Sequence, residues 1–523
     1  MELHTLIDGL PVTVIRGEAA TLRVCDLTDD SRTAVPGSLF IARRGHDQDG
    51  RQYVEAAIEC GAVAVLTDDR ELEMPERSRA IVLFTQDVPG VTGRLAERFY
   101  GEPSTRLTLV GVTGTNGKTT VAHLVHQILN DLGERCGLIG TVEIDDGRET
   151  AAAVLTTPPA VELSRSLATM IEAGCVACVM ETSSHALDQQ RAGALAFDIG
   201  VFTNLTGDHL DYHGDLETYA RAKKRLFDRL GPDGVSVVNT DDARGEQMAG
   251  PNPSRCSLAD PDADWFASLE RESLDGLTLS LRGPEYELRA RVPLIGSFNA
   301  MNTLQAVAAA DAVLQRLGHE PGARRAAIEH ALPRVQAPAG RLQNVSQPSD
   351  PAVFVDFAHT DDALASSLAA LKRLVPAGGK LRVVFGCGGL KDTTKRPRMG
   401  KVAAGLADVV IVTSDNPRTE SPSHIISQVI EGIDPMDRAR TTTHVDREPA
   451  IREAILNADP RDVILIAGKG HETVQELPDG QGGVVHRSFD DRLIAKEILR
   501  EARLRRADPG ASPAGSGTAG AAR

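Results

Sequence analysis

Gly111-Val-Thr-Gly-Thr-Asn-Gly-Lys-Thr-Thr120 is the stretch that decides the fold, because it joins an apolar segment, residues 107–112, to an amphipathic one, residues 119–132. A glycine-rich turn between a strand and a helix lets backbone N–H groups close around phosphate oxygens, and the helix N-terminus adds partial positive charge. Lys118 can reach the β- and γ-phosphates, and Thr119 offers a hydroxyl to magnesium. The stretch favours nucleotide binding, and the alternative is an ordinary glycine-rich turn between a strand and a helix. Alone it does not distinguish a kinase, a GTPase, an ATPase and a ligase.

Working outward from this turn, apolar strands alternate with amphipathic helices, which predicts a mostly parallel sheet covered by helices. A Pro- and Gly-containing break near residues 332–340 precedes a second α/β region. Its expected strands are 352–357, 381–385, 409–413 and 463–467. Another break, Gly101-Glu-Pro-Ser104, ends a first region with short β-type runs and one helical stretch, Tyr53 to Cys60.

Three α/β domains are therefore expected in this chain of 523 residues, since single cores seldom organise more than roughly 100–200 residues. The tail is Ala-, Gly-, Ser- and Pro-rich and is predicted to be disordered. The expected boundaries are 1–103, 104–338, 339–505 and, for the tail, 506–523.

The composition excludes several classes of protein. A net charge of -16 repels nucleic acid and anionic membranes, and no apolar run approaches the ~18–20 residues that span a bilayer. We therefore expect a cytoplasmic protein with no nucleic-acid partner and no membrane insertion. Seven cysteines are too few for a disulfide framework. Cys175 and Cys178 form a CxxC, but their apolar surroundings favour a buried strand over a metal or redox site.

Charged side chains follow the central strands. Glu181 ends the strand-like run 176–180, where a carboxylate suits a hard cation such as magnesium. The segment Asp208 to His213 contains two Asp and two His and fits a metal site or a capped loop equally well. In the helical stretch 217–227, Lys223 and Lys224 by themselves favour a solvated basic face.

Several ordered blocks resemble the Mur ligases over residues 20 to 500. The family's phosphate loop has the shorter glycine spacing of this chain, which accounts for Val112 at a position where the common pattern has glycine. The other blocks are Asp30-Ser-Arg32, Pro36-Gly-Ser-Leu-Phe40, Gly45-His46, Thr156-Thr-Pro158, Glu181 to His185, Asn204 to His213, Gly296-Ser-Phe-Asn-Ala-Met-Asn302, Asp356-Phe-Ala-His-Thr360, Asp415-Asn-Pro-Arg418 and Gly468-Lys-Gly-His-Glu472.

The resemblance implies a three-domain α/β fold: an N-terminal mixed α/β uridine-binding domain, a central parallel-sheet ATPase domain with the phosphate loop, and a Rossmann-like C-terminal domain. It also implies ATP and two Mg²⁺ ions, and catalytic roles for Lys118, Lys223, His209 and Glu181. ATP contacts are expected at Gly114, Thr115, Asn116, Gly117, Lys118, Thr119, Thr120, Asn302, Arg341 and Asp356. Metal ligands are expected at Thr119, Glu181, His209 and Lys223, the last as a carbamate that supplies anionic oxygen.

The remaining expected residues bind the two substrates that the resemblance implies. A UDP-N-acetylmuramoyl-dipeptide would contact Ser31, His46, Thr156, Thr157, Ser184, Gln189 and Arg191. The incoming amino acid would contact Lys391, Asp415, Asn416, Pro417, Arg418, Gly468 and Glu472. The loop Asp415 to Arg418 is similar to the family's diaminopimelate motif, in which Arg binds a carboxylate bidentately and its neighbours take the ammonium end. A purely structural Asn-Pro turn is the alternative.

The expected reaction is ATP-dependent addition of meso-diaminopimelate to the D-Glu γ-carboxylate through an acyl phosphate, by an enzyme expected to be a monomer. Three departures from the family pattern motivate an alternative, a specialised paralogue that joins another amine. Lys391 stands where arginine is usual, Gln343 where glutamate is usual, and Asp361 where proline is common. A nucleotide-dependent switch or kinase is a second alternative, although no Asn-Lys-x-Asp motif is evident.

Overall fold

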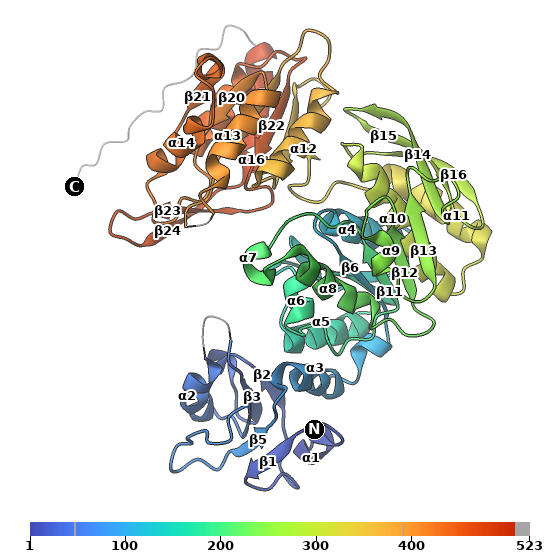
Figure 1. The fold of residues 1–523 in the computed structure, drawn as a ribbon, viewed down its shortest axis with the longest axis vertical. Coiled ribbons are helices and arrows are strands. Elements are labelled where there is room, and N and C mark those ends of the chain that lie inside the picture. Colours follow the sequence, from blue (N-terminus) through green and yellow to red (C-terminus); the bar gives the residue numbers. More distant parts are fainter. Residues whose placement is uncertain (46–48, 391, 508–523) are drawn as a thin grey trace. The chain divides into compact units, whose positions relative to one another are not determined.

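The computed structural model describes residues 1–45, 49–390 and 392–507 (Figure 1). His46, Lys391 and residues 508–523 of the predicted tail lie outside the described residues. The chain forms two compact units. The first comprises Met1–Glu270, Thr278–Val292 and Phe298–Val335, and the second comprises Arg271–Leu277, Pro293–Ser297 and Gln336–Arg523.

A five-stranded sheet forms the N-terminal part of the first unit. β2 (Asp26–Thr28), β3 (Ser38–Ala42), β4 (Ala64–Thr67) and β5 (Ile81–Phe84) are parallel neighbours, and β1 (Thr13–Arg16) is antiparallel to β5. Its helices are α1 (Leu3–Ile7), α2 (Val54–Glu59) and α3 (Val88–Phe99), with 3₁₀ turns η1 (Ser31–Thr33), η2 (Gly50–Tyr53) and η3 (Pro103–Thr105).

The helix α3 was not expected, because the sequence indicated one helical stretch in this region. Pro89, Gly90 and Gly93 discourage a helix prediction, yet each fits its place. Pro89 lies in the first turn, where it loses no intrahelical bond, and Asp87 caps that turn by accepting from the N–H of Gly90 at 3.0 Å. A Cβ on Gly93 would lie 2.9 Å from the Cβ of Ala194. The glycine thus permits close packing.

The central sheet has eleven strands in the order β16-β15-β14-β13-β12-β11-β6-β10-β7-β8-β9. Seven neighbouring strands run parallel, in the order β14, β13, β12, β11, β6, β10 and β7. Beyond β7, the strands β8 and β9 form an antiparallel edge. The connection from β6 leads to β7 on one side, and that from its neighbour β11 leads to β12 on the other, so the carboxyl ends of β6 and β11 form a topological switch point, the usual place for a ligand in open α/β sheets. The glycine-rich loop begins there.

The elements of this central part are as follows. Its strands are β6 (Thr108–Thr113), β7 (Cys136–Ile139), β8 (Glu143–Asp145), β9 (Thr150–Ala152), β10 (Ala177–Glu181), β11 (Ile199–Phe202), β12 (Val235–Asn239), β13 (Pro253–Ser257), β14 (Trp265–Ser273), β15 (Gly276–Arg282) and β16 (Glu287–Val292). Its helices are α4 (Lys118–Asp131), α5 (Ala160–Glu172), α6 (Ser184–Asp188), α7 (Leu210–His213), α8 (Leu216–Phe227), α9 (Gly245–Met248), α10 (Phe298–Arg316) and α11 (Pro321–Ala331), followed by η4 (Leu332–Arg334).

The second unit contains a six-stranded sheet in the order β17-β18-β22-β19-β20-β21, parallel except for β17. Separate apolar clusters cover its two faces, one including α12, α13 and α14 and the other α15 and α16. The strands are β17 (Gln343–Asn344), β18 (Ala352–Asp356), β19 (Leu381–Phe385), β20 (Val409–Val412), β21 (Thr441–Thr443), β22 (Val463–Ala467) and the hairpin β23 (Val474–Pro478) with β24 (Val484–Ser488). The helices are α12 (Asp361–Lys372), α13 (Lys395–Leu406), α14 (Pro422–Glu431), α15 (Arg447–Leu456) and α16 (Asp491–Ala507), with η5 (Asp437–Arg440).

Two further expectations concern cysteines and membranes. All seven cysteines are free, and both members of the CxxC are buried, Cys178 within β10, which confirms the buried-strand interpretation. No helix in the described part of the chain combines the length and apolar character needed to span a membrane.

Candidate active site

The glycine-rich loop after β6 has a backbone that only glycine adopts easily. Gly114 has φ +149° and Gly117 has φ +89°. A Cβ on Gly117 would lie 2.5 Å from Oδ1 of Asn302, and one on Gly114 would lie 1.8 Å from Oγ1 of Thr203. The loop therefore packs closely against α10 and the end of β11. Its backbone leads directly into the N-terminus of α4 at Lys118.

The two predicted catalytic lysines meet at this loop. Lys118 Nζ donates to the carbonyl oxygens of Gly114 at 3.1 Å and Thr115 at 2.9 Å. Lys223 Nζ, from α8, donates to the same Gly114 oxygen at 2.7 Å. The site therefore holds two amines at one edge of the phosphate loop, where anionic oxygens would be attracted.

Lys223 is buried, with 1% of its surface exposed, so the solvated basic face is wrong for this residue. Its Nζ lies 4.2 Å from the centroid of the Tyr219 ring. Burial lowers the pKa of its ammonium well below the usual value, and nearby Lys118 adds to this effect. Tyr219, Ala222, Lys223 and Leu226 follow the i, i+3, i+4, i+7 spacing of a buried helix face, which is the signal that could have identified it.

Glu181 forms the second centre of the site. Its carboxylate is fully buried and accepts from Thr119 Oγ1 at 2.9 Å, which joins two predicted magnesium ligands. Thr141 also binds it, through its N–H to Oε1 at 2.7 Å and its hydroxyl to Oε2 at 3.0 Å. Sequence reasoning missed Thr141, because the threonine follows a different strand, β7, and only the sheet order brings it to Glu181.

His209 is not joined to Glu181 by any contact in the described part of the chain. The backbone of His209 has φ +54°, its side chain is 48% exposed, and the centroid of its ring lies 4.8 Å from that of His185. Among the described residues, no three His, Cys, Asp or Glu side chains are grouped as a metal site would require. The structure thus brings Thr119, Glu181 and Lys223 to the phosphate loop region, and the metal role of His209 stays a prediction.

Three of the residues predicted to bind the UDP-linked substrate, Thr156, Thr157 and Arg191, are linked to Glu181 directly or through one neighbour. Thr157 Oγ1 donates to the Glu181 backbone oxygen at 2.8 Å, and Arg191 donates to the Thr157 oxygen. Thr156 Oγ1 accepts from Thr141 at 3.1 Å. Of the other predicted residues, Ser184 and Gln189 contact α7, and Ser31 lies in η1. Ser184 Oγ is 3.0 Å from His213 Nε2, Gln189 Nε2 donates to Tyr212 Oη at 3.4 Å, and Ser31 belongs to η1 of the N-terminal sheet.

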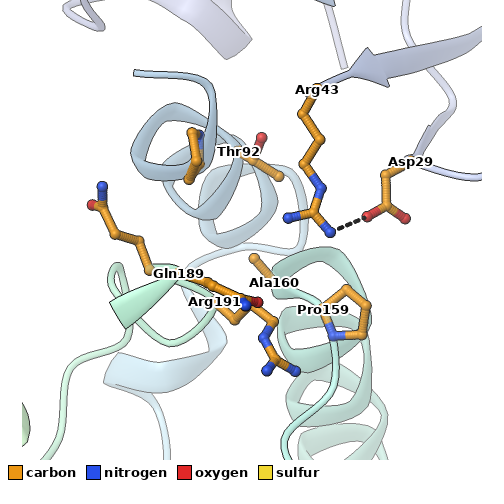
Figure 2. Close-up of a pocket in the computed structure, with 9 residues that line it drawn as sticks. Asp29, Arg43, Thr92, Pro159, Ala160, Gln189 and Arg191 are labelled. Carbon is orange, nitrogen blue, oxygen red and sulfur yellow. Dashed lines mark ion pairs between the residues drawn. The ribbon is translucent and has the colours of Figure 1, made fainter. Parts of the chain in front are cut away.

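Figure 2 shows a pocket that includes Gln189 and Arg191. Arg43 and Asp29, which form an ion pair at 3.6 Å, line it from the N-terminal sheet. Burial lowers the pKa of Arg191, and Arg43 lowers it further, so the pocket favours an anionic ligand. Sequence reasoning missed Arg43. Its position just after β3 was the available signal, since ligands gather at the carboxyl ends of parallel strands. The other lining residues are Pro89, Thr92, Pro159, Ala160 and Gln190.

In the second unit, two predicted amino-acid-binding loops follow β20 and β22. Asn416 Nδ2 donates to Glu472 Oε2 at 2.8 Å, which joins the two loops. Gly468 has φ +114°, and a Cβ there would lie 2.4 Å from Oδ2 of Asp415. Arg418 also has a positive φ, +55°; its Nε lies 2.8 Å from Glu476 Oε2, and its Nη1 donates to the Gly389 oxygen. Pro417 lies between Asn416 and Arg418 and restricts the backbone of that turn.

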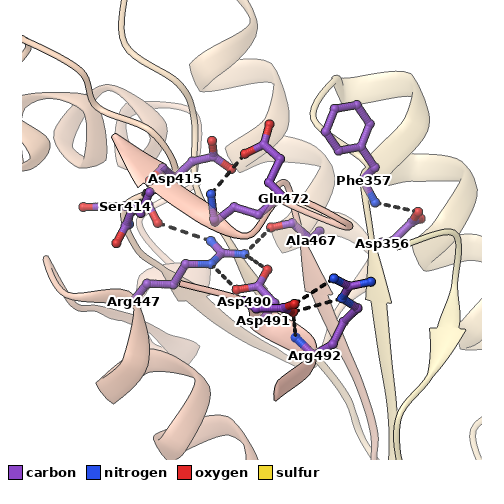
Figure 3. Close-up of polar contacts among 12 residues, drawn as sticks. Asp356, Phe357, Ser414, Asp415, Arg447, Ala467, Glu472, Asp490, Asp491 and Arg492 are labelled. Atoms are coloured by element: carbon purple, nitrogen blue, oxygen red, sulfur yellow. Dashed lines mark hydrogen bonds and ion pairs between the residues drawn. The ribbon is translucent and has the colours of Figure 1, made fainter. Parts of the chain in front are cut away.

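A buried ion pair supports both loops (Figure 3). Arg447 and Asp491 are fully buried and pair through Nε–Oδ1 at 2.8 Å and Nη2–Oδ2 at 2.7 Å. The same guanidinium donates to the oxygens of Ser414 at 3.2 Å and Ala467 at 2.8 Å, the residues just before Asp415 and Gly468. Sequence reasoning did not single out this pair.

Two predicted ATP contacts lie in the same unit. Asp356 is buried at the end of β18 and accepts from Ser367 Oγ at 2.5 Å, and burial raises the pKa of its carboxyl. The guanidinium of Arg341 lies 5.1 Å from the centroid of the Phe357 ring. The adjoining Gly340 packs directly on the second loop, because a Cβ on it would lie 2.3 Å from the carbonyl carbon of Gly470.

Comparison with known proteins identifies this architecture. Three family models match the chain: "Mur ligase family, catalytic domain" at residues 26–100, "Mur ligase middle domain" at 112–310, and "Mur ligase, glutamate ligase domain" at 340–470. A UDP-N-acetylmuramoyl-L-alanyl-D-glutamate--2,6-diaminopimelate ligase of Synechococcus elongatus is 41% identical over 510 residues, which cover 96% of this chain and 99% of the relative. The chain belongs to the Mur ligase family. It is an enzyme with the three-domain fold and ATP-dependent ligase chemistry of that family.

Further relatives agree with this assignment. A ligase of the same description from Pseudomonas aeruginosa is 42% identical to this Mur ligase and covers 91% of the chain and 95% of the relative. A solved structure of such a ligase aligns with a TM-score of 0.68 and 32% identity, covering 96% of this chain and 99% of the other. A MurF ligase from Thermotoga maritima in complex with ADP has a TM-score of 0.59 at 17% identity, covers 94% of this chain and 99% of that one, and shares the fold.

Proposed function

We propose that this Mur ligase uses ATP to join 2,6-diaminopimelate to the D-Glu γ-carboxylate of UDP-N-acetylmuramoyl-L-alanyl-D-glutamate, in cytoplasmic peptidoglycan synthesis. The observation that carries the proposal is the similarity to ligases of that description along nearly the whole chain, at 41% and 42% identity. Such similarity spans the substrate loops of both units. It does not favour the paralogue that joins a different amine.

The phosphate loop would hold the triphosphate. Gly114 and Gly117 have positive φ angles and shape the turn that leads into α4, whose N-terminal backbone N–H groups suit phosphate oxygens. Lys118 would exchange its bonds to the loop carbonyls for bonds to the phosphates. It would thereby reduce the repulsion between the triphosphate and the attacking γ-carboxylate. This attack releases ADP and leaves an acyl phosphate.

Thr119 and Glu181 fit Mg²⁺, because a hydroxyl oxygen and a carboxylate, already 2.9 Å apart, are the hard ligands that this ion prefers. Bound Mg²⁺ would neutralise phosphate charge. Lys223 has a lowered pKa, so its amine is available in the neutral form that reacts with carbon dioxide to give a carbamate. We include two ions, His209 as a further ligand and a carbamylated Lys223 in the proposal.

The amino acid would bind in the second unit. Arg418 offers a guanidinium for the distal carboxylate, while Glu472, held by Asn416, offers an acceptor for the distal ammonium. The free amino group would attack the acyl carbon, release phosphate and lose a proton, which forms the amide. The meso form is the expected isomer, and we expect the enzyme to act as a monomer.

The test is incubation with ATP, Mg²⁺, the UDP-dipeptide and single amino acids, with products read by mass. The expected product has the mass of the tripeptide only with meso-diaminopimelate. The variant Lys118→Ala should release no ADP, since the loop loses its lysine. Turnover with another amino acid alone would replace the substrate assignment, and near-normal turnover by Lys118→Ala would refute the phosphate site.

A further inference from the structure

Lys469 is a fully buried cation between the two amino-acid-binding loops, and neither the family motif nor the proposed reaction assigns it a role. Its Nζ donates to Asn416 Oδ1 at 3.1 Å, Glu472 Oε2 at 3.0 Å and Val474 O at 2.6 Å. An ammonium has three donors, and this one uses all of them. The side chain is therefore fixed in one orientation.

These bonds define how the two neighbouring side chains point. Glu472 Oε2 accepts from both Lys469 and Asn416, which fixes the carboxylate plane. Among the described residues, no hydrogen bond involves Glu472 Oε1, and about a third of this side chain is exposed. One carboxylate oxygen is thus held inside the protein while the other faces outward. Such an oxygen is suited to accept from a substrate ammonium.

The amide of Asn416 is oriented in the same way. Its Oδ1 accepts from Lys469 and from the N–H of Glu476 at 3.1 Å, so its Nδ2 must face Glu472. Gln475 Nε2 donates to the Asp415 oxygen at 2.8 Å and ties β23 to the same loop. Lys469 therefore stands at the centre of a network that joins the loop after β20, the loop after β22 and β23.

We propose that Lys469 is a positioning residue that sets the specificity of this enzyme for the distal ammonium of its amino-acid substrate. It acts through Glu472 and Asn416 and does not touch the substrate. The inference rests on the proposed function, because it assumes that the substrate carries such a group. Its chemistry is simple: a buried charge holds a partner carboxylate in one geometry, and misplacing a binding group by about 1 Å can lower turnover about 100-fold.

The test compares meso-diaminopimelate with 2-aminopimelate, which lacks only the second ammonium. In Lys469→Met, the ratio of kcat/KM for the two amino acids should fall about 10- to 100-fold, with KM for ATP and for the UDP-dipeptide unchanged. Lys401→Met, which changes an exposed lysine of α13, is the matched control and should leave the ratio unaltered. If Lys469→Met loses its melting transition, Lys469→Gln keeps two donors and should lower the ratio in the same direction.

An unchanged ratio in a folded variant overturns the inference and leaves the proposed function intact. A parallel rise of all three KM values with a lower melting temperature also overturns it, because that pattern indicates a purely structural lysine. If the unaltered enzyme does not use diaminopimelate, the proposed function fails first and the inference fails with it.

Discussion

Replacing Asp491 by Asn removes the charge partner of buried Arg447 while preserving side-chain size. The two side chains have no exposed surface and form two bonds of 2.8 and 2.7 Å, so the variant leaves a guanidinium in the interior without its carboxylate. Breaking a buried pair in this way costs about 3–5 kcal/mol. With a tenfold change for each 1.36 kcal/mol, this loss corresponds to about two to four orders of magnitude in an opening equilibrium.

Hydrogen exchange measured by mass spectrometry suits this experiment, because a chain with two units need not unfold in one step. Amides of β20 and β22 should exchange faster by about two to four orders of magnitude. The single tryptophan, Trp265, belongs to the first unit, so its fluorescence transition in urea should not move. The control Asp459→Asn breaks an exposed pair with Arg461 and should change the free energy of opening, obtained from the exchange rates, by about 0–1 kcal/mol. A change below about fivefold in β22 would refute the assigned role of the buried pair.

Three other outcomes are expected. Gly117→Ala should weaken nucleotide binding, measured by calorimetry, by at least about tenfold, because it adds left-handed strain of about 1–2 kcal/mol and a clash with Asn302. The control Gly133→Ala has a similar φ and no neighbour within 4 Å, so it should bind nucleotide normally. Lys223→Ala should be inactive and partly regain activity with short carboxylates, and full activity without them would exclude the carbamate. Burial lowers the pKa of His471 to about 4 from an ordinary 6.5, so protonation opposes folding. The melting temperature of the second unit should therefore fall as the pH drops from about 6.5 towards 4, and His471→Phe should flatten this dependence; an identical pH profile would contradict it.

The strands of the second sheet were predictable to the residue in two cases. The runs at 381–385 and 463–467 coincide with β19 and β22, because strands buried on both faces are almost continuously apolar, and Arg382 alone interrupts these two. The phosphate loop was also predictable, since its glycines and lysine act within one turn. In contrast, α3 was missed because Pro89, Gly90 and Gly93 discourage a helix prediction, and the close packing of Gly93 depends on a distant partner, Ala194.

Site residues were hidden where the topology, and not the local sequence, makes the contact. Thr141 reaches Glu181 only because β7 and β10 are neighbours. Arg447 lies far in sequence from Ser414, yet its guanidinium bonds the end of β20. Lys223 is the intermediate case, because the helical spacing on α8 indicated burial although its charge indicated solvent. Family resemblance supplied the expected role of Lys223, but it did not supply Thr141 or Arg447.

The contact between Gly340 and Gly470 restricts how this enzyme can change in evolution. A Cβ on Gly340 would meet the backbone of Gly470 and His471, and a Cβ on Gly470 would meet Phe357, so neither position has room for a larger residue. A substitution at either glycine would require the backbone beside it to move, which a single nucleotide change does not supply. New amine preferences are therefore expected to arise from substitutions at loop tips, while this glycine pair remains constant.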